Sequence, residues 1–337
     1  METGKINTLT SGNRGRAYGV VLAMCAVFTI WTGSAFAAGY PTRPVRMIVP
    51  FAAGANIDIT ARQIAQKLAD SLGQPVVVEN RGGAGGTIGT TMAAKATPDG
   101  YTILMGNAPA VGIAPSVYRN LPYDPVKSFT AVGRATNLSM VLAVSSTLPV
   151  NSVADLVAYA KVRPNQLNYA SSGNGTLAHL SGVLLSNKAG LEMKHVPYNS
   201  VPQAFVDISS GAVALIFYPY QGLVPVAQSG KVRLLATTGT KRTSYLPAVP
   251  TMIESGVGDF VMMAWEGFYV PVGTPKPIVD ALYAALARII TDPAFVSRLA
   301  TVGIDVDIAP PDVFAAFTKS EVERFRQLIA IAGVKIE

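Results

Sequence analysis

The stretch that decides the fold is residues 45–79, VRMIVPFAAGANIDITARQIAQKLADSLGQPVVVE. Val45 to Val49 is a short apolar run rich in β-branched residues, which is typical of a buried strand. After a turn of small residues, apolar side chains recur every three or four positions from Ile57 to Leu72, as on one face of a helix. Gly73 ends this helix, and Pro75 opens a second strand. A strand, a helix and a strand in this order predict a right-handed crossover in a parallel sheet.

The same alternation continues toward the C-terminus. A glycine-rich turn at 82–86, a helix over 87–96 and a strand over 101–105 complete a first α/β unit. After Met140 a second series of short strands and helices begins, and the Gly/Pro-rich segment AWEGFYVPVGTP, residues 264–275, is expected to lead out of it. Apolar periodicity over 277–332 predicts helices near the end of the chain. The fold class is therefore predicted to be α/β with mostly parallel sheets.

The N-terminus has the parts of a secretory signal peptide. Three basic residues precede an apolar run over 17–31, and residues 35–37 form an A-x-A cleavage site. A membrane-spanning helix would need about 20 apolar residues, more than this run has. Cys25 lies in the run, but Met24 stands where a lipoprotein signal requires a small residue. Residues 1–37 are therefore predicted to be a signal peptide cleaved after Ala37, which places a cysteine-free mature chain in the periplasm.

The composition excludes several classes of protein. Half of the 337 residues are hydrophobic and 14% are charged, which excludes a disordered chain. The formal charge is +7, but Lys and Arg are scattered singly, without the basic runs and interleaved aromatic residues of a nucleic-acid binder. Residues 1–37 carry three basic residues and Glu2, so the mature charge is +5. We take this excess as a mild preference for anions and expect no nucleic-acid partner.

Few residues are available for catalysis or for a metal site. The chain has two histidines, His179 and His195, and no cysteine after the leader, which excludes zinc sites of Cys and His and a cysteine nucleophile. The motifs HExxH, GxSxG and the Walker A loop are absent. A serine hydrolase would have to combine Ser171 or Ser172 with His179, and no orienting carboxylate is close in sequence. We expect no enzyme, no metal and no cofactor.

The segment SSGNGTLAH, residues 171–179, is the better of two glycine-rich candidates for a ligand site. Gly173, Gly175 and Ala178 fit G-x-G-x-x-A between a strand and a helix, but Glu192 is misplaced for a dinucleotide ribose. The backbone N–H groups of such a turn and of the following helix can still hold a carboxylate or another anion. Ser172 and Thr176 are candidates both for hydroxyl donors to that anion and for caps of the helix.

The turn PFAAGANID, residues 50–58, follows the first strand at the edge where open α/β sheets bind ligands. Asn56 and Asp58 are both candidates for the helix cap, and Asp58 is alternatively an acceptor for a ligand amine or a bridging water. His179 is either a packing residue or a donor to an anion. His195, inside an apolar strand, is expected to be a satisfied core histidine.

The chain resembles the Bug/TctC-type family, the extracytoplasmic binding proteins of tripartite tricarboxylate transporters. Matching segments occur in the family's order at residues 41–62, 74–89, 96–106, 167–182, 195–211, 230–256 and 265–275. The resemblance implies a type II periplasmic binding protein, with lobe 1 formed by 38–139 plus 262–337 and lobe 2 by 140–261. It also implies that the two lobes close on a small organic acid, and that a monomer delivers this acid to the membrane subunits of the transporter. A periplasmic sensor that presents its ligand to a two-component system remains the alternative.

The resemblance also implies which residues touch the ligand. They belong to the loop after the first strand, to the rim after the third strand and to the glycine turn of the second lobe: Phe51, Ala52, Ala53, Gly54, Asp58, Asn107, Ser172, Gly173, Gly175, Thr176 and Tyr198, with His179, Asn199 and Tyr218 in supporting positions. The sequence departs from the family at Ala55, at Asn199 and Ser200, and at Ala214. Because a lysine and a carboxylate are thereby lost, and Tyr218 and Tyr220 are close by, an aromatic carboxylate is a candidate ligand.

Overall fold

The computed structural model describes residues 1–4, 39–198, 200–301 and 303–334. The chain divides into two units, Met1–Thr42 and Arg43–Glu337. The predicted cleavage site and the apolar run of the leader lie outside the described residues, as does Asn199. Among the described residues, no helix has both the length and the apolar character needed to cross a membrane. The strands of the sheet all belong to the unit that begins at Arg43.

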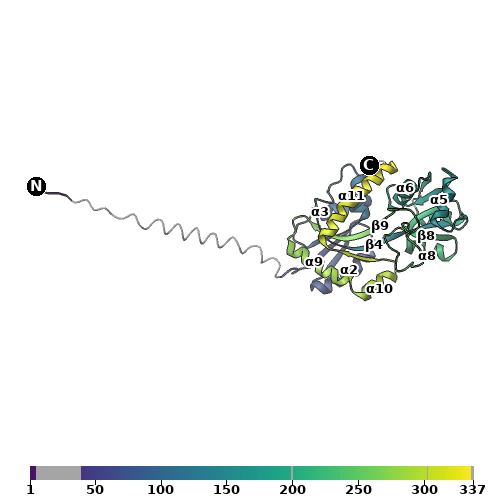
Figure 1. Ribbon diagram of the computed structural model, residues 1–337. Coiled ribbons are helices and arrows are strands. Elements are labelled where there is room, and N and C mark those ends of the chain that lie inside the picture. The colour runs from purple at the N-terminus through teal and green to yellow at the C-terminus, as the bar shows by residue number, and fades with distance from the viewer. Residues whose placement is uncertain (5–38, 199, 302, 335–337) are drawn as a thin grey trace. The chain divides into compact units, whose positions relative to one another are not determined.

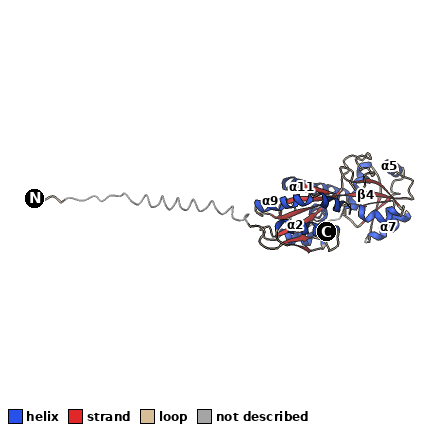
Figure 2. Ribbon diagram, turned by 90° about the horizontal axis from the view of Figure 1, so that it is seen from below, coloured by secondary structure: helices blue, strands red, loops and turns tan. Residues whose placement is uncertain are grey.

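The predicted strand–helix–strand segment is confirmed. β1 (Val45–Val49) pairs in parallel with β2 (Val76–Asn80) on one side and β3 (Thr102–Asn107) on the other. α2 (Asn56–Leu72) forms the crossover from β1 to β2, and its apolar stripe, including Ile57, Ile64 and Leu68, is buried. α2 also packs against α9 (Lys276–Ile290), and Figure 2 shows these two helices at one end of the sheet.

Two long antiparallel strands lie in the middle of the sheet order. β4 (Phe129–Ser145) pairs with β9 (Met263–Pro271) through Ser139, and from Met140 onward it pairs with β7 (Leu215–Pro219). The same second half of β4 pairs with β8 (Val232–Thr237), and its first half pairs with β10 (Val306–Ala309). β4 therefore joins two strand groups: a first group of β2, β1, β3, β9 and β10, and a second group of β7, β8, β5 and β6. The proposed lobe boundaries at 139/140 and 261/262 remain a prediction.

Residues 264–275 were expected to lead out of the second unit, and their first part does so as a strand that was not predicted from the sequence. β9 is a buried strand that pairs antiparallel with both β3 and β4, and Trp265 and Tyr269 are fully buried in it. Gly267 is required there, because a Cβ at this position would collide with the Phe314 ring and come within 2.9 Å of the Gly133 carbonyl oxygen. The glycine thus permits close packing on β9 and does not end the strand.

The second strand group has parallel pairs. β5 (Asn168–Ser171) lies between β6 (Lys194–Pro197) and β7 and is parallel to both. The helices of this group are α5 (Val153–Lys161), α6 (Leu177–Ala189), α7 (Val201–Ser210) and α8 (Tyr220–Gln228). The predicted α/β class is confirmed, with parallel strands at both ends of the order and antiparallel pairs around β4.

The remaining helices cover the first strand group and the junction. They are η1 (Ala84–Gly86), α3 (Thr87–Ala94), η2 (Ala108–Ile113), α4 (Ala114–Val117), α10 (Pro293–Thr301) and α11 (Pro311–Ala332). α11, the yellow helix in Figure 1, packs against β4, η2 and α6, so it contacts elements of both groups. Its buried Glu321 accepts hydrogen bonds from Trp265 Nε1 at 3.0 Å and from Arg324 Nε at 2.6 Å. These bonds satisfy the carboxylate where α11 meets β9.

Candidate functional site

The loop after β1 is held by a buried carboxylate. Asp58 Oδ2 accepts the Gly54 N–H at 2.8 Å and Arg62 Nε at 3.0 Å, while Oδ1 accepts Asn80 Nδ2 at 2.9 Å. Burial raises the pKa of Asp58, but these hydrogen bonds from Gly54, Arg62 and Asn80 outweigh it, so the pKa is lowered. Asp58 therefore ties the loop to α2 and β2 as a carboxylate. The expectation that Asn56 or Asp58 caps α2 is wrong, because Ala55 is the N-cap residue and has no side-chain cap.

The glycine turn after β5 is held by the side chains of Ser171 and Thr176. Gly173 has φ +123° and Gly175 has φ +73°, conformations that favour glycine. Thr176 Oγ1 donates to the Gly173 carbonyl oxygen at 2.8 Å and, as the N-cap of α6, accepts the His179 N–H. Ser171 Oγ contacts both the N–H and the carbonyl oxygen of Gly173. The turn is therefore fixed before any ligand arrives.

The two histidines lie behind this turn and stack on each other. Their ring centroids are 3.9 Å apart, and Tyr169 stacks on His195. The Gly175 N–H donates to His179 Nδ1 at 3.0 Å, so the neutral ring carries its proton on Nε2. Burial, together with the neighbouring His195, lowers the pKa of His179 to about 4. His179 thus has a supporting role for the turn, and His195 is satisfied by Ser171 Oγ at 2.6 Å.

A pocket of about 380 Å³ lies in front of the glycine turn, and we call it the cleft pocket. Its walls come from the β1 loop, from η1, η2 and α4, and from the start of α6 and the end of β7, with Met140 of β4 and Ala264 of β9 between them. Its lining residues are Phe51, Gly85, Pro109, Ile113, Ala114, Val117, Tyr118, Met140, Ser172, Asn174, Gly175, Thr176, Leu177, Ala178, Tyr218, Pro219 and Ala264. None of these is a Lys, Arg, Asp, Glu or His.

The structure brings five of the expected site residues to this pocket: Phe51, Ser172, Gly175, Thr176 and Tyr218. Ala52, Ala53, Gly54 and Gly173 belong to the turns next to the lining, and Asp58 of α2 and His179 of α6 hold these turns by hydrogen bonds. Asn107 ends β3, and its Oδ1 accepts the Ala110 N–H at 3.1 Å, which caps η2. Tyr198 donates its hydroxyl to Asp207 at 2.6 Å. These residues shape the segments around the pocket without lining it.

The apolar wall of the pocket was not predicted from the sequence. Pro109, Ile113, Ala114 and Val117 come from η2 and α4, which follow β3 directly. Such residues carry no chemical motif, and their role depends on how η2 turns toward α6 and α11. A small-residue run after the third strand, at the sheet edge that binds ligands, is the only sequence signal that could have indicated them.

Among the described residues, Ser171 does not form the pairing with His179 that a serine hydrolase was expected to use. Ser171 is 1% exposed and contacts His195, whereas the candidate pairing was with His179. Among the described residues, no carboxylate hydrogen-bonds to either imidazole. The site therefore has the geometry of a binding pocket, in which main-chain groups and hydroxyls meet an apolar wall.

Comparison with known proteins identifies the class. The family model described as "Tripartite tricarboxylate transporter family receptor" (TctC) matches residues 60–334. Protein BugT of Bordetella pertussis is 34% identical over 321 residues, which cover 94% of this chain and 98% of BugT. The chain belongs to the TctC receptor family, as the resemblance indicated.

Solved structures agree with this family and with the predicted fold. The structure described as "R. palustris Rpa4515 with adipate" has a TM-score of 0.74 and 33% identity, covering 88% of this chain and all of that one. The structure of the periplasmic binding protein BugD has a TM-score of 0.70 and 38% identity over the same shares. The fold is that of the periplasmic binding proteins.

Proposed function

We propose that this protein is a periplasmic receptor that captures a carboxylic acid with an apolar body in the cleft pocket and delivers it to the membrane subunits of a tripartite tricarboxylate transporter. The observation that carries the proposal is the chemistry of the lining. Hydroxyl and main-chain groups gather at the glycine turn, and the rest of the wall is apolar and without charged side chains. Such a pocket suits a ligand with a charged end and an uncharged body.

The charged end is assigned to the start of α6. Leu177 and Ala178 are the first residues of the helix, so their N–H groups have no carbonyl partner within it. Ser172 adds a hydroxyl donor, whereas the Thr176 hydroxyl already donates to the Gly173 carbonyl oxygen, and all four residues line the pocket. A helix N-terminus with these groups favours a carboxylate without any cationic side chain. The anion is thus recognised by the backbone, and the missing lysine noted in the sequence is not needed.

The body of the ligand is assigned to the apolar wall. Phe51, Ile113, Val117 and Met140 face the pocket, whose volume of about 380 Å³ is at the small end of the usual range for ligand sites. A multiply charged acid such as citrate would place carboxylates against these side chains, at a desolvation cost of several kcal/mol. The similarity to a receptor solved with adipate, a dicarboxylate with an aliphatic body, supports the same class here.

The proposal includes the parts of the molecule outside the described residues. The leader is taken to direct export and to be cleaved after Ala37. The mature protein is taken to act as a monomer without enzymatic activity, because the serine nearest to a histidine, Ser171, is buried and lacks an orienting carboxylate. Delivery to membrane subunits follows from the family's function.

Isothermal titration with adipate, terephthalate, benzoate, malate, citrate and glutamate tests the ligand class. Adipate or terephthalate is expected to bind at least tenfold more tightly than citrate. Their second carboxylate lies at the far end of an apolar body and can stay in water at the open side of the pocket, whereas citrate carries three carboxylates on a short chain and would place at least one against the apolar wall. Tight binding of citrate with no response to the acids that have apolar bodies would contradict the proposal.

A charge at the anion end provides a second test. Ser172→Asp places a carboxylate in an exposed position of the turn, where it competes with the ligand for the same N–H groups. Binding of adipate is expected to weaken about 100-fold or more, since like charges in one site repel strongly. Ser320→Asp on the exposed face of α11 makes the same change away from the pocket and is expected to leave the affinity unchanged. Equal affinities of the two variants would place the anion elsewhere.

A further inference from the structure

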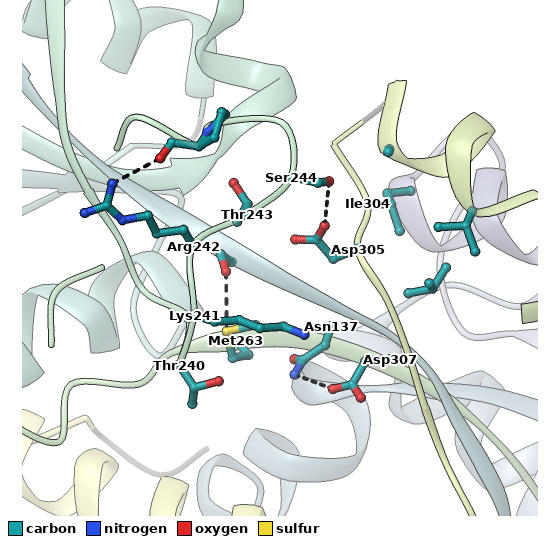
Figure 3. Close-up of a pocket in the computed structure, with 16 residues that line it drawn as sticks. Asn137, Thr240, Lys241, Arg242, Thr243, Ser244, Met263, Ile304, Asp305 and Asp307 are labelled. Carbon is teal, nitrogen blue, oxygen red and sulfur yellow. Dashed lines mark hydrogen bonds between the residues drawn. The ribbon is translucent and has the colours of Figure 1, made fainter. Parts of the chain in front are cut away.

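A second and larger cavity lies on the opposite face of the β4–β9 ribbon from the cleft pocket. Its volume is about 750 Å³, and we call it the back pocket (Figure 3). Ser139 and Met263 line the back pocket, whereas their chain neighbours Met140 and Ala264 line the cleft pocket. Successive side chains of a strand point to opposite faces, so the same two strands separate the pockets. Capture of an acid in the cleft pocket leaves the back pocket without a role.

The walls of the back pocket come from two segments on either side of this ribbon. Residues 239–247, which follow β8 of the second strand group, form one wall. The other wall is formed by side chains of α10, of the segment before β10 and of β10: Val296, Ala300, Ile304, Asp305, Val306 and Asp307. Figure 3 shows Lys241 reaching from the first wall toward Asn137, and Asp305 lying on the second wall. A ligand here would therefore contact both walls at once.

Two of the four charged side chains in the back pocket are already neutralised. Arg242 Nε pairs with Glu254 at 2.9 Å, and the Asp307 carboxylate pairs with Arg134 at 2.8 Å and accepts Asn137 Nδ2 at 3.0 Å. The other two are Lys241 and Asp305. Lys241 forms no ion pair with any described residue, and Asp305 accepts the Ser244 hydroxyl, at 3.2 Å, and the Ser244 backbone N–H. The pocket thus presents one cation and one anion that attract each other electrostatically but are too far apart to form an ion pair.

One buried polar atom in the same lining lacks a partner, and a second has only a neighbouring hydroxyl. Asn137 Oδ1 has no hydrogen-bond partner among the described residues, whereas Thr243, which is 3% exposed, lies beside the Tyr245 hydroxyl. A buried polar atom without a partner costs about 1–3 kcal/mol, so native structures rarely retain one without a reason. An ammonium group could donate to Asn137 Oδ1, and a carboxylate could accept from the Thr243 hydroxyl.

We propose that the back pocket is a second binding site, for a small zwitterion whose ammonium group pairs with Asp305 and whose carboxylate pairs with Lys241. Asn137 Oδ1 supplies a further acceptor for the ammonium group, and the Thr243 hydroxyl a further donor for the carboxylate. The ligand class is a short amino acid that carries both charges. This class differs from the acid proposed for the uncharged cleft pocket. The proposal for the back pocket does not depend on the identity of that acid.

Methionine methyl groups can report on the two pockets separately, because Met263 lines the back pocket and Met140 the cleft pocket. The protein is labelled with ¹³C-methyl methionine, and the two signals are assigned with Met263→Leu and Met140→Leu. Glycine, β-alanine and 5-aminopentanoate are titrated as probes. At least one probe is expected to shift the Met263 signal saturably and leave the Met140 signal in place, while adipate acts on Met140.

Charge variants test the pairing. Lys241→Met and Asp305→Asn are each expected to weaken the effective probe at least tenfold, whereas Lys95→Met, a lysine outside both pockets, leaves it unchanged. Lys241 is exposed, so its replacement is not expected to disturb folding, which the melting temperature verifies. Pentanoate and pentylamine, which carry one charge each, should bind at least tenfold more weakly than 5-aminopentanoate if that is the effective probe.

Three outcomes would overturn the inference. They are the absence of a Met263 shift with all probes, a shift at Met140 alone, and a Met263 shift that the charge variants do not weaken. Binding of the singly charged analogues as tight as that of the zwitterion would overturn the ligand class. Because adipate binding is read at Met140, failure of the cleft proposal would be recognised separately.

Discussion

Replacing Gly173 with valine is expected to weaken binding of the cleft ligand about 30-fold. Gly173 has φ +123°, a conformation that a β-branched residue adopts only with strain of about 2 kcal/mol. A Cβ at this position would meet only the Thr176 Cγ2 atom, at 3.9 Å, so the penalty comes from the backbone and not from a collision. If the turn relaxes, Gly173 moves away from Ser171 and Thr176, and the N–H groups at the start of α6 lose their alignment. About 1.4 kcal/mol corresponds to a factor of ten in affinity.

Gly190→Val is the matched control for this change. Gly190 caps the other end of α6 with φ +64°, and a Cβ at this position would have no atom within 4 Å, so the variant has a similar backbone penalty far from the pocket. Its melting temperature should fall while its affinity for adipate, measured by calorimetry, stays at the wild-type value. Unchanged affinity in Gly173→Val would show that the turn does not contact the ligand.

Acidification is expected to destabilise the protein through His179. The folded-state pKa of about 4 lies below the ordinary value of 6.5, because burial and the stacked His195 disfavour the charged ring. Between these two values the unfolded state binds more protons than the folded state, so stability falls as the pH falls. The contribution is fully present above pH 6.5, and up to about 3 kcal/mol is lost on reaching pH 4. Protonation of Nδ1 would also remove the acceptor of the Gly175 N–H.

His179→Asn isolates this contribution from the carboxylates that titrate in the same range. Asparagine offers an oxygen near the position of Nδ1 and does not titrate, so it can still accept from Gly175. Urea unfolding at pH 7, 6, 5 and 4 is expected to show a smaller loss of unfolding free energy in the variant than in the wild type. An equal fall of the unfolding free energy with pH in the two proteins would contradict the assignment of this loss to His179.

The parallel strands of the fold could be predicted from the sequence, but the antiparallel strand β9 in the middle of the sheet order could not. β1, α2 and β2 follow from apolar runs, one helical stripe and the Gly73 and Pro75 signals, all of which are local. β9 was missed because it carries Glu266, Gly267 and a terminal proline, residues that weaken a strand pattern. Burial raises the pKa of Glu266 to about 7, and Thr136 Oγ1 donates to it at 3.0 Å. Tertiary contacts allow these residues in a buried strand, and the hydrophobic periodicity of the sequence does not show such contacts.

The candidate site also has one part that could be predicted from the sequence and one part that could not. The glycine turn was predicted because Gly173, Gly175 and Thr176 have local reasons to form an anion-binding turn before a helix. The wall formed by Ile113, Val117 and Met140 consists of ordinary apolar residues that are distant from the turn in sequence. Only the fold brings them together. Family resemblance indicated the β1 loop, but of its residues only Phe51 lines the pocket.

The uncharged lining of the cleft pocket has a consequence for how receptors of this kind change their specificity. Side-chain replacement cannot delete a backbone N–H except through proline, so the proposed carboxylate end of the site would persist while Ile113, Val117, Met140 and Tyr218 vary. Each of these side chains alters the length or width available to the ligand without disturbing the anion contact. A small library at these positions should therefore yield sensors for acids of different chain length from a single scaffold.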